Sequence, residues 1–205
     1  MQALAGIKVI DFSKWLPGQY CGMLLGDYGA DVIKVEDMGG DSTRRFFPEK
    51  EDGMSYWHLM LNRNKRGIAL DIRSAEGQEV LRRLLSDADV FLEGFRPGYL
   101  ARYGLDYESI KKINPRIVYC SITGFGPNCH KPAHDLNVIG LAGLNSMDDL
   151  GSACVSEVQV SAIGSSLNAL SAICMALLAR ERTGIGQFLD VNLYATALSL
   201  QVTGI

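Results

Sequence analysis

The segment from residue 4 to residue 36 constrains the fold more than any other part of the chain, because it reads as strand, turn, helix and strand. A short apolar run over 7–12 indicates the first strand. A Pro-Gly pair is expected to break it, helical spacing covers 20–28, and a β-branched run covers 31–36. Two strands joined by so short a helix form a βαβ unit, which requires parallel strands and a right-handed crossover. We therefore expect a ligand beyond the carboxyl ends of parallel strands, where residues 13–17 follow the first strand.

The alternation of strands and helices continues along the chain. Further strands are expected at 67–72, 89–93, 116–123 and 187–192, and helices at 54–61, 74–85, 100–103, 107–113, 135–144 and 164–182. This rhythm predicts an α/β fold with a doubly wound, mostly parallel sheet that carries helices on both faces. Linkers and internal repeats are not evident, so residues 1–205 are expected to form one domain.

Composition argues against several classes of protein. The net charge of −3 and the isoelectric point near 5.6 do not favour a general nucleic-acid surface. Residues 160–179 lack charge, but serine, glycine and asparagine interrupt them, so a buried helix is expected there and no membrane span. The first residues show no secretory signal pattern. Five cysteines without metal-type spacing predict reduced, mostly buried thiols in a cytoplasmic protein.

Three familiar site types find little support in the motifs. The glycine-rich spots do not follow the first strand as G-x-G-x-x-G, so NAD binding is not expected. The pair of Ser165 or Ser166 with His130 lacks the pattern of a nucleophile elbow. Cys129, His130 and His134 lack a fourth ligand at the usual spacing, so we expect no metal.

Five blocks in order resemble the family III CoA-transferases, the group that includes formyl-CoA and carnitine CoA-transferases and the α-methylacyl-CoA racemases. The blocks are residues 4–36, 62–81, 89–98, 113–126 and 177–193. The resemblance implies a Rossmann-like large domain that binds CoA, and an intertwined homodimer of chains about twice this length. This chain matches the first half of that pattern, without the small second domain. A truncated protein, a fragment or one product of a split gene would each fit.

The resemblance also implies where coenzyme A lies. By position in the matching blocks, Leu16 and Pro17 would abut the CoA, Leu70 to Arg73 (Leu70, Asp71, Ile72 and Arg73) would edge the adenine and phosphates, and Gly94, Phe95, Arg96 and Arg102 would form the next wall. Arginine suits phosphate because the guanidinium fork offers paired donors. Without the family, Arg73 and Arg102 would be read as solvated surface charges.

The transferase chemistry needs a carboxylate that this chain does not supply at the usual place. In the family, an aspartate attacks the acyl-CoA thioester to give a mixed anhydride, and a second acid finally takes over the CoA. Counting back from Arg180 by the family's spacing gives Ala162. Three explanations compete: the nucleophile is lost, the chain is a non-catalytic subunit that pairs with an active homologue, or the register is wrong and Glu157 serves. We rank the last lowest and hypothesise that this chain alone transfers no CoA.

The alternative function is a racemase that uses His134, since racemases of this family carry His-Asp at a similar place. An imidazole suits exchange of the α-proton because its pKa lies near neutrality. The partner aspartate would again fall at Ser161 or Ala162. A plainer interpretation is that His134 caps a helix and Asp135 supplies charge to its first turn. The expected partners are acyl-CoA, a carboxylic acid, and a second copy or a homologous subunit.

Overall fold

The computed structural model describes residues 2–46, 53–145, 150–152, 154 and 156–202, which form a six-stranded, all-parallel sheet. The strands are β1 (Lys8–Phe12), β2 (Asp31–Glu36), β3 (Lys65–Ala69), β4 (Val90–Glu93), β5 (Val118–Thr123) and β6 (Phe188–Asn192). Their order in the sheet is β3-β2-β1-β4-β5-β6. The order reverses between β1 and β4, the point at which open α/β sheets place a ligand. The doubly wound, Rossmann-like sheet expected from the sequence is thereby confirmed.

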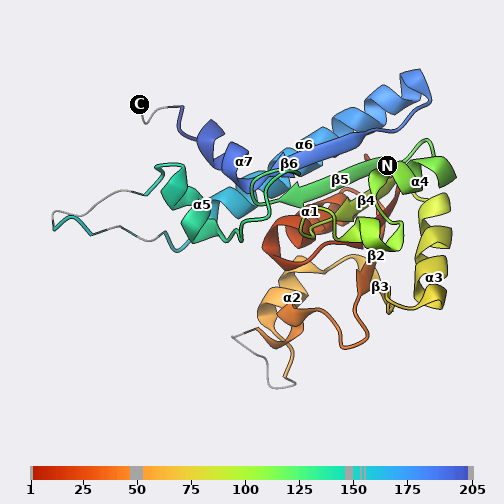
Figure 1. The fold of residues 1–205 in the computed structure, drawn as a ribbon, viewed down its shortest axis with the longest axis horizontal. Coiled ribbons are helices and arrows are strands. Elements are labelled where there is room, and N and C mark those ends of the chain that lie inside the picture. The colour runs from red at the N-terminus through yellow and green to blue at the C-terminus, as the bar shows by residue number, and fades with distance from the viewer. Residues whose placement is uncertain (1, 47–52, 146–149, 153, 155, 203–205) are drawn as a thin grey trace.

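Helices cover both faces of the sheet, as Figure 1 shows. They are α1 (Trp15–Asp27), α2 (Tyr56–Leu61), α3 (Ala75–Ser86), α4 (Tyr107–Ile113), α5 (Asp135–Leu141), α6 (Val160–Thr183) and α7 (Leu193–Ser199), with 3-10 turns η1 (Ser42–Arg45) and η2 (Leu100–Tyr103). One apolar core joins α1 and α6 to the sheet, and a second joins α3, η2 and α4 to the opposite face. Burial of these two faces holds the layers together.

The first helix begins earlier than the sequence predicts. A Pro-Gly pair was expected to separate strand from helix, yet α1 starts at Trp15 and includes Pro17 in its first turn. Proline is tolerated there because the N–H that it lacks would have no partner within the helix. Trp15 has a φ of 62°, which is rare for a bulky side chain. The segment expected to be a loop is therefore the tightly turned start of a helix.

Two other boundaries differ from the prediction. Strand β3 starts at Lys65 instead of residue 67, because the side chains that read as a polar hinge find acidic partners: Lys65 pairs with Asp11 and Arg66 with Asp31. Helix α6 starts at Val160 instead of residue 164. Its added turn is tied by hydrogen bonds to α5, a contact between segments far apart in the sequence.

The environments of the thiols and of α6 also refine the sequence analysis. Cys21 and Cys120 are buried, whereas Cys154 and Cys174 are exposed and Cys129 is half-buried, so the expectation of mostly buried thiols holds for two of the five. By length and composition α6 could cross a membrane, with 39% of its most apolar window buried. Its inner face, including Ala169 and Ile173, belongs to the core that it shares with the sheet and α1.

Candidate functional site

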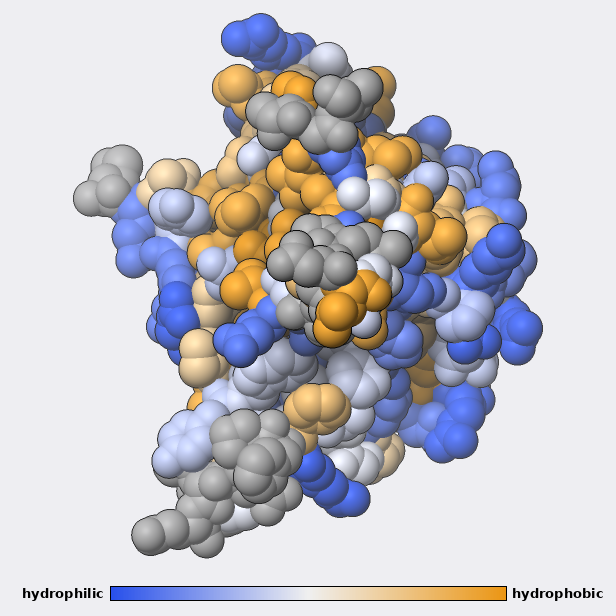
Figure 2. Space-filling model, turned by 90° about the vertical axis from the view of Figure 1, so that its left-hand side faces the viewer, coloured by the Kyte–Doolittle hydropathy of each residue, from blue (hydrophilic) through white to orange (hydrophobic). Residues whose placement is uncertain are grey.

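Two adjoining cavities lie at the carboxyl ends of the strands, the end of the molecule that faces the viewer in Figure 2. The larger, here called the main cavity, has a volume of about 440 Å³ and is bounded by the first turn of α1, the turn after β4, and the junction of α5 with α6. The smaller, here called the rim cavity, has a volume of about 300 Å³ and lies against the turn between β3 and α3. Lys14 lines both cavities. Because they share Lys14, the two cavities are here together called the cradle, which lies across the switch point of the sheet.

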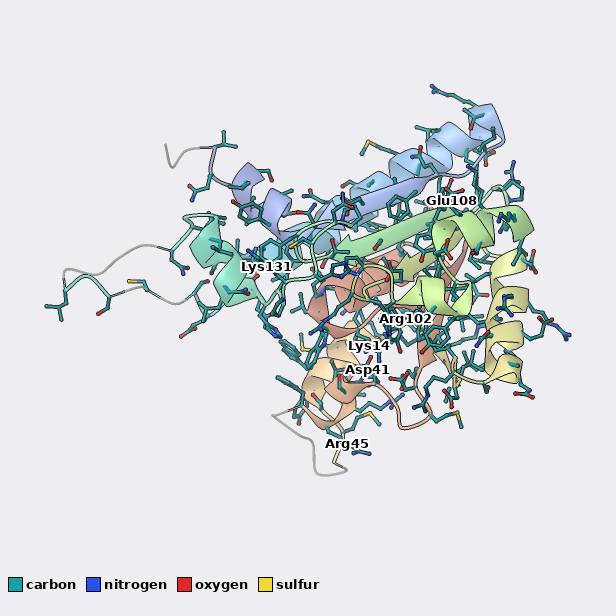
Figure 3. All side chains as sticks on the ribbon, viewed as in Figure 1. Lys14, Asp41, Arg45, Arg102, Glu108 and Lys131 are labelled. Atoms are coloured by element: carbon teal, nitrogen blue, oxygen red, sulfur yellow. The ribbon has the colours of Figure 1, made fainter. Side chains whose placement is uncertain are left out.

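The structure gathers all but one of the residues singled out by the resemblance into this cradle. The main cavity is lined by seven of them: Leu16, Pro17, Gly94, Phe95, Arg96, His134 and Ala162. The rim cavity is lined by Leu70, Asp71, Ile72 and Arg73. Arg102 is the exception, since it lies exposed on η2 and lines neither cavity (Figure 3).

Two cations that line the cradle, Lys14 and Arg73, are held by short ion pairs. Lys14 Nζ lies 2.5 Å from Asp37 Oδ2, and it also lies 5.4 Å from the centroid of the Phe95 ring. Arg73 Nε lies 2.8 Å from Asp71 Oδ1, and this contact lowers the pKa of the Asp71 carboxyl. Such exposed pairs contribute little to stability and can exchange partners at low cost. The two cations are therefore available to an anionic ligand.

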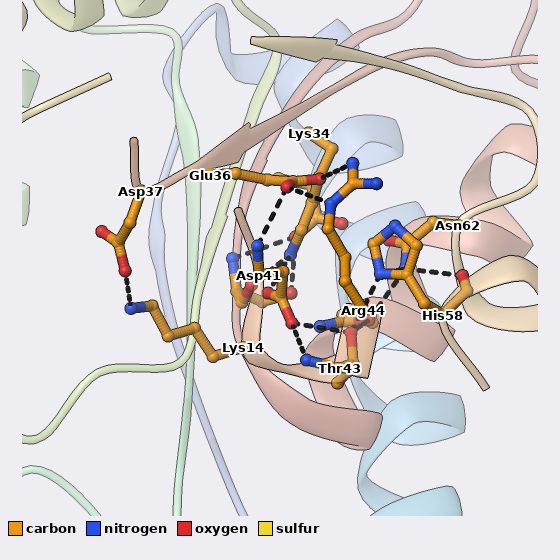
Figure 4. A network of polar contacts seen from close by, with 12 residues as sticks. Lys14, Lys34, Glu36, Asp37, Asp41, Thr43, Arg44, His58 and Asn62 are labelled. Atoms are coloured by element: carbon orange, nitrogen blue, oxygen red, sulfur yellow. Dashed lines mark hydrogen bonds and ion pairs between the residues drawn. The ribbon is translucent and has the colours of Figure 1, made fainter. Parts of the chain in front are cut away.

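Beneath the first turn of α1 lies a network of buried charges (Figure 4). Lys34 Nζ lies 3.9 Å from Asp11 Oδ1 and 3.6 Å from Asp41 Oδ2, and it donates a hydrogen bond to the carbonyl oxygen of Ser13. Asp11 also accepts hydrogen bonds from the backbone N–H and the hydroxyl of Ser13. Burial favours the neutral form of Asp11, but Lys34 and Lys65 outweigh it and the pKa of Asp11 is lowered. The network thus holds Ser13 in place, and Ser13 immediately precedes Lys14, a residue that lines the main cavity.

An aromatic wall closes one side of the main cavity, and the sequence analysis missed it. The rings of Trp15 and Phe46 meet edge to face at 5.9 Å, and those of Phe46 and Trp57 stack at 5.2 Å. All three residues line the cavity. They come from α1, the segment after η1, and α2, so only the presence of aromatic residues in these three separate segments could have signalled the wall in the sequence.

The junction of α5 and α6 forms the opposite side of the main cavity. His134 is the N-cap residue of α5, and its backbone N–H donates to Asn137 Oδ1 at 2.6 Å. Asp135 Oδ1 accepts hydrogen bonds from Ser161 Oγ at 2.6 Å and from the backbone N–H of Ala162 at 2.9 Å. Ala162 therefore lies in the first turn of a helix that faces the cavity. Glu157 is exposed and does not line the cavity.

A third cavity, of about 310 Å³, lies on the other side of Arg96 and Pro97. Glu93 lines it, and its side chain accepts a hydrogen bond from the backbone N–H of Phe95 at 2.7 Å. Burial raises the pKa of Glu93 to about 7, although hydrogen bonds from Ser121 and Phe95 oppose that shift. A buried acid that titrates near neutral pH thus supports the turn that carries Phe95.

Metal-ligating side chains do not gather in the part of the chain that the structure describes. In that part, no three histidine, cysteine, aspartate or glutamate residues are arranged to hold an ion. Cys129, His130 and His134 all line the main cavity without forming such a group.

Comparison with known proteins shows the family of the chain. The model of the CoA-transferase family III matches residues 4–204. The chain belongs to this family. The succinate–glutarate CoA-transferase of Agrobacterium fabrum is 42% identical to it, over 93% of this chain and 50% of that protein. The beta subunit of the succinyl-CoA–L-malate CoA-transferase of Chloroflexus aurantiacus is 36% identical, over 93% of this chain and 49% of that subunit.

The fold of the family III chain also matches a solved structure. A CAIB/BAIF family protein from Brucella suis superimposes with a TM-score of 0.93 at 39% identity, over 98% of this chain and 56% of that one. The chain thus spans about half the length of the curated relatives that it matches.

Proposed function

We propose that this family III chain binds an acyl-CoA in the cradle and takes part in the transfer of CoA between a thioester and a carboxylic acid. The observation that carries the proposal is that eleven of the twelve residues to which the resemblance assigns a binding or catalytic place line two cavities that share Lys14. In this arrangement the adenine and phosphates occupy the rim cavity near Arg73. The pantetheine arm passes Lys14 and Phe95 and brings the thioester to Ala162 and His134.

The acid that exchanges with the thioester is proposed to be a dicarboxylic acid. The names of two relatives include succinate, glutarate and malate. The main cavity offers cationic or titratable side chains for a second carboxylate, since Arg96, His130 and Lys131 line it. A carboxylate beside a guanidinium or ammonium group gains charge-assisted hydrogen bonds. The subunit name of one relative also supports assembly with a homologous subunit, beside the homodimer that the resemblance implies.

We further propose that position 162 does not supply the family's nucleophile in this chain. The methyl group of Ala162 lies at the cavity, within the first turn of α6, and cannot attack a thioester. If a carboxylate reacts here, another residue of the cavity provides it; if none does, the chain is a non-catalytic subunit. A racemase that uses His134 is the second candidate, favoured by the position of that imidazole in the cavity beside Asp135.

Lys14→Met is expected to weaken the binding of acetyl-CoA about tenfold, because it removes a charged donor at the junction of the two cavities. Isothermal titration calorimetry at low salt measures the dissociation constant. Lys8→Met is the matched control, since Lys8 forms an exposed ion pair with Asp87 at the opposite end of β1. Absence of acetyl-CoA binding to the folded, unaltered chain would contradict the proposed function.

Ala162→Asp is expected to create an acyl acceptor at position 162. After incubation with acetyl-CoA and trapping with hydroxylamine, a hydroxamate should appear on residue 162, where the unaltered chain can form none. Ala162→Asn is the control, because it has nearly the same shape and no carboxylate. A hydroxamate that never appears on residue 162, although the variant binds acetyl-CoA, would show that the family's register has been misplaced.

A further inference from the structure

The main cavity still contains a carboxylate, although position 162 has none. Of the described residues that line this cavity, Asp135 is the only acid. Its Oδ1 atom accepts two hydrogen bonds, from Ser161 Oγ at 2.6 Å and from the backbone N–H of Ala162 at 2.9 Å. A carboxylate therefore lies within hydrogen-bond distance of the backbone of the residue that the family's spacing selects for the nucleophile.

The surroundings of Asp135 suit a reactive carboxylate. Within the described residues, its second oxygen, Oδ2, has no hydrogen-bond partner. Oδ1 faces the amino-terminal turn of α6, a helix of 24 residues, where the backbone N–H groups point toward the carboxylate. Lys131 lines the same cavity, as do the imidazole side chains of His130 and His134. One oxygen is thus anchored while the other remains available.

Three other acids near the strand ends do not meet these conditions. Glu157 is exposed and lies outside the cavity lining. Asp11 is fully buried and engaged by Lys34 and Lys65. Glu93 is buried and lines the third cavity instead of the main one.

We propose that Asp135 is the carboxylate that accepts the acyl group in this chain, an inference that rests on the proposed binding of acyl-CoA. The free oxygen of Asp135 attacks the thioester carbonyl carbon, the C–S bond breaks, and CoA leaves as the thiolate with the electron pair. The product is a mixed anhydride between Asp135 and the acyl group. The thiolate then attacks the aspartyl carbonyl, which releases the first acid and leaves an aspartyl-CoA thioester.

The second acid completes the exchange without any further reagent. Its carboxylate attacks the aspartyl thioester, which expels CoA thiolate and forms a new anhydride. The thiolate attacks the acyl carbon of that anhydride, so the new acyl-CoA forms and the Asp135 carboxylate is restored. The N–H of Ala162 and the hydroxyl of Ser161 are positioned to stabilise negative charge that develops on the aspartyl oxygen.

Asp135 also has a structural role, because its Oδ1 atom fastens α5 to the start of α6. That role would be served equally by asparagine, whose amide oxygen can accept the same two hydrogen bonds. Asp135→Asn therefore separates the two roles. It retains the acceptor that holds the helices and removes the nucleophile.

The test is peptide mapping of the unaltered 205-residue chain after incubation with acetyl-CoA and trapping with hydroxylamine. We expect a hydroxamate on Asp135. In Asp135→Asn the yield of protein-bound hydroxamate should fall at least tenfold while the dissociation constant of acetyl-CoA, measured by calorimetry, changes less than about twofold. Glu157→Gln, an exposed acid just before α6, is the matched control and should keep the full yield.

The outcomes separate this inference from the proposed function. Binding of acetyl-CoA without a hydroxamate on Asp135, or with a hydroxamate on another residue, overturns the inference and leaves the proposed binding function intact. No binding at all overturns the proposed function itself. Because the mapping uses the unaltered chain, the result does not depend on whether Asp135→Asn folds. Ser161→Ala adds a second variant, which should slow adduct formation without moving it from Asp135.

Discussion

Lys34→Met is expected to lower the free energy of unfolding by about 3–5 kcal/mol, the usual cost of removing one partner from a buried ion network. Lys34 is 2% exposed and lies between the carboxylates of Asp11 and Asp41. Asp11 would retain Lys65, whose Nζ atom lies 2.8 Å away, but Asp41 would lose its only lysine partner within the described residues. The variant would thus leave an uncompensated negative charge in the interior.

Urea titration at neutral pH measures this loss. Lys8→Met serves as the control and should leave stability nearly unchanged, because Lys8 and Asp87 are both largely exposed. Adding Asp41→Asn to Lys34→Met should restore part of the loss by removing the unpaired charge. A loss below about 1 kcal/mol in the single variant would argue that water reaches the network.

Glu93→Gln is expected to become more stable relative to the unaltered chain as the pH rises, by about 3 kcal/mol between pH 4.5 and pH 8. Burial raises the pKa of Glu93 from 4.5 to about 7 in the folded state. The folded state therefore holds this proton more tightly than the unfolded state. Below pH 4.5 both states are protonated and no penalty arises. Above that pH the unfolded state ionises first, so stability falls until the folded pKa is passed near pH 7.

The measurement compares urea unfolding of both proteins at several pH values, so that titration of shared groups cancels. Glu181→Gln is the control for the loss of an acidic side chain as such, since Glu181 is exposed on α6. A difference between Glu93→Gln and the unaltered chain that stays flat from pH 5 to pH 8 would mean that Glu93 ionises normally in the folded protein.

The sheet could be predicted from the sequence because its strands are short apolar runs with regular spacing. The apolar runs near residues 7–12, 31–36 and 116–123 matched β1, β2 and β5 within two residues at each end. Prediction failed where tertiary partners override local signals. The hinge-like residues before β3 became strand because Lys65 reaches a carboxylate in β1. The extra turn of α6 forms because Asp135 accepts its N–H and hydroxyl groups.

The residues of the candidate site could likewise be predicted only in part from the sequence. The resemblance placed Leu16, Arg73 and Ala162 at positions that the fold brings into one cradle, since parallel strands end at a common edge. It offered no means of pairing Asp135 with residue 162, because 27 residues separate them and only the packing of α5 on α6 joins them. Arg102 was expected beside the CoA from the resemblance alone, and on η2 it is exposed and lines neither cavity.

The aromatic wall gives the chain a built-in optical sensor. The protein has two tryptophans, Trp15 and Trp57, and both line the main cavity on either side of Phe46. Tryptophan emission, excited selectively over that of the eight tyrosines, thus originates entirely from the main cavity. Any molecule that enters there changes the polarity around both indole rings, so occupancy can be followed in the native chain without a dye or an attached label.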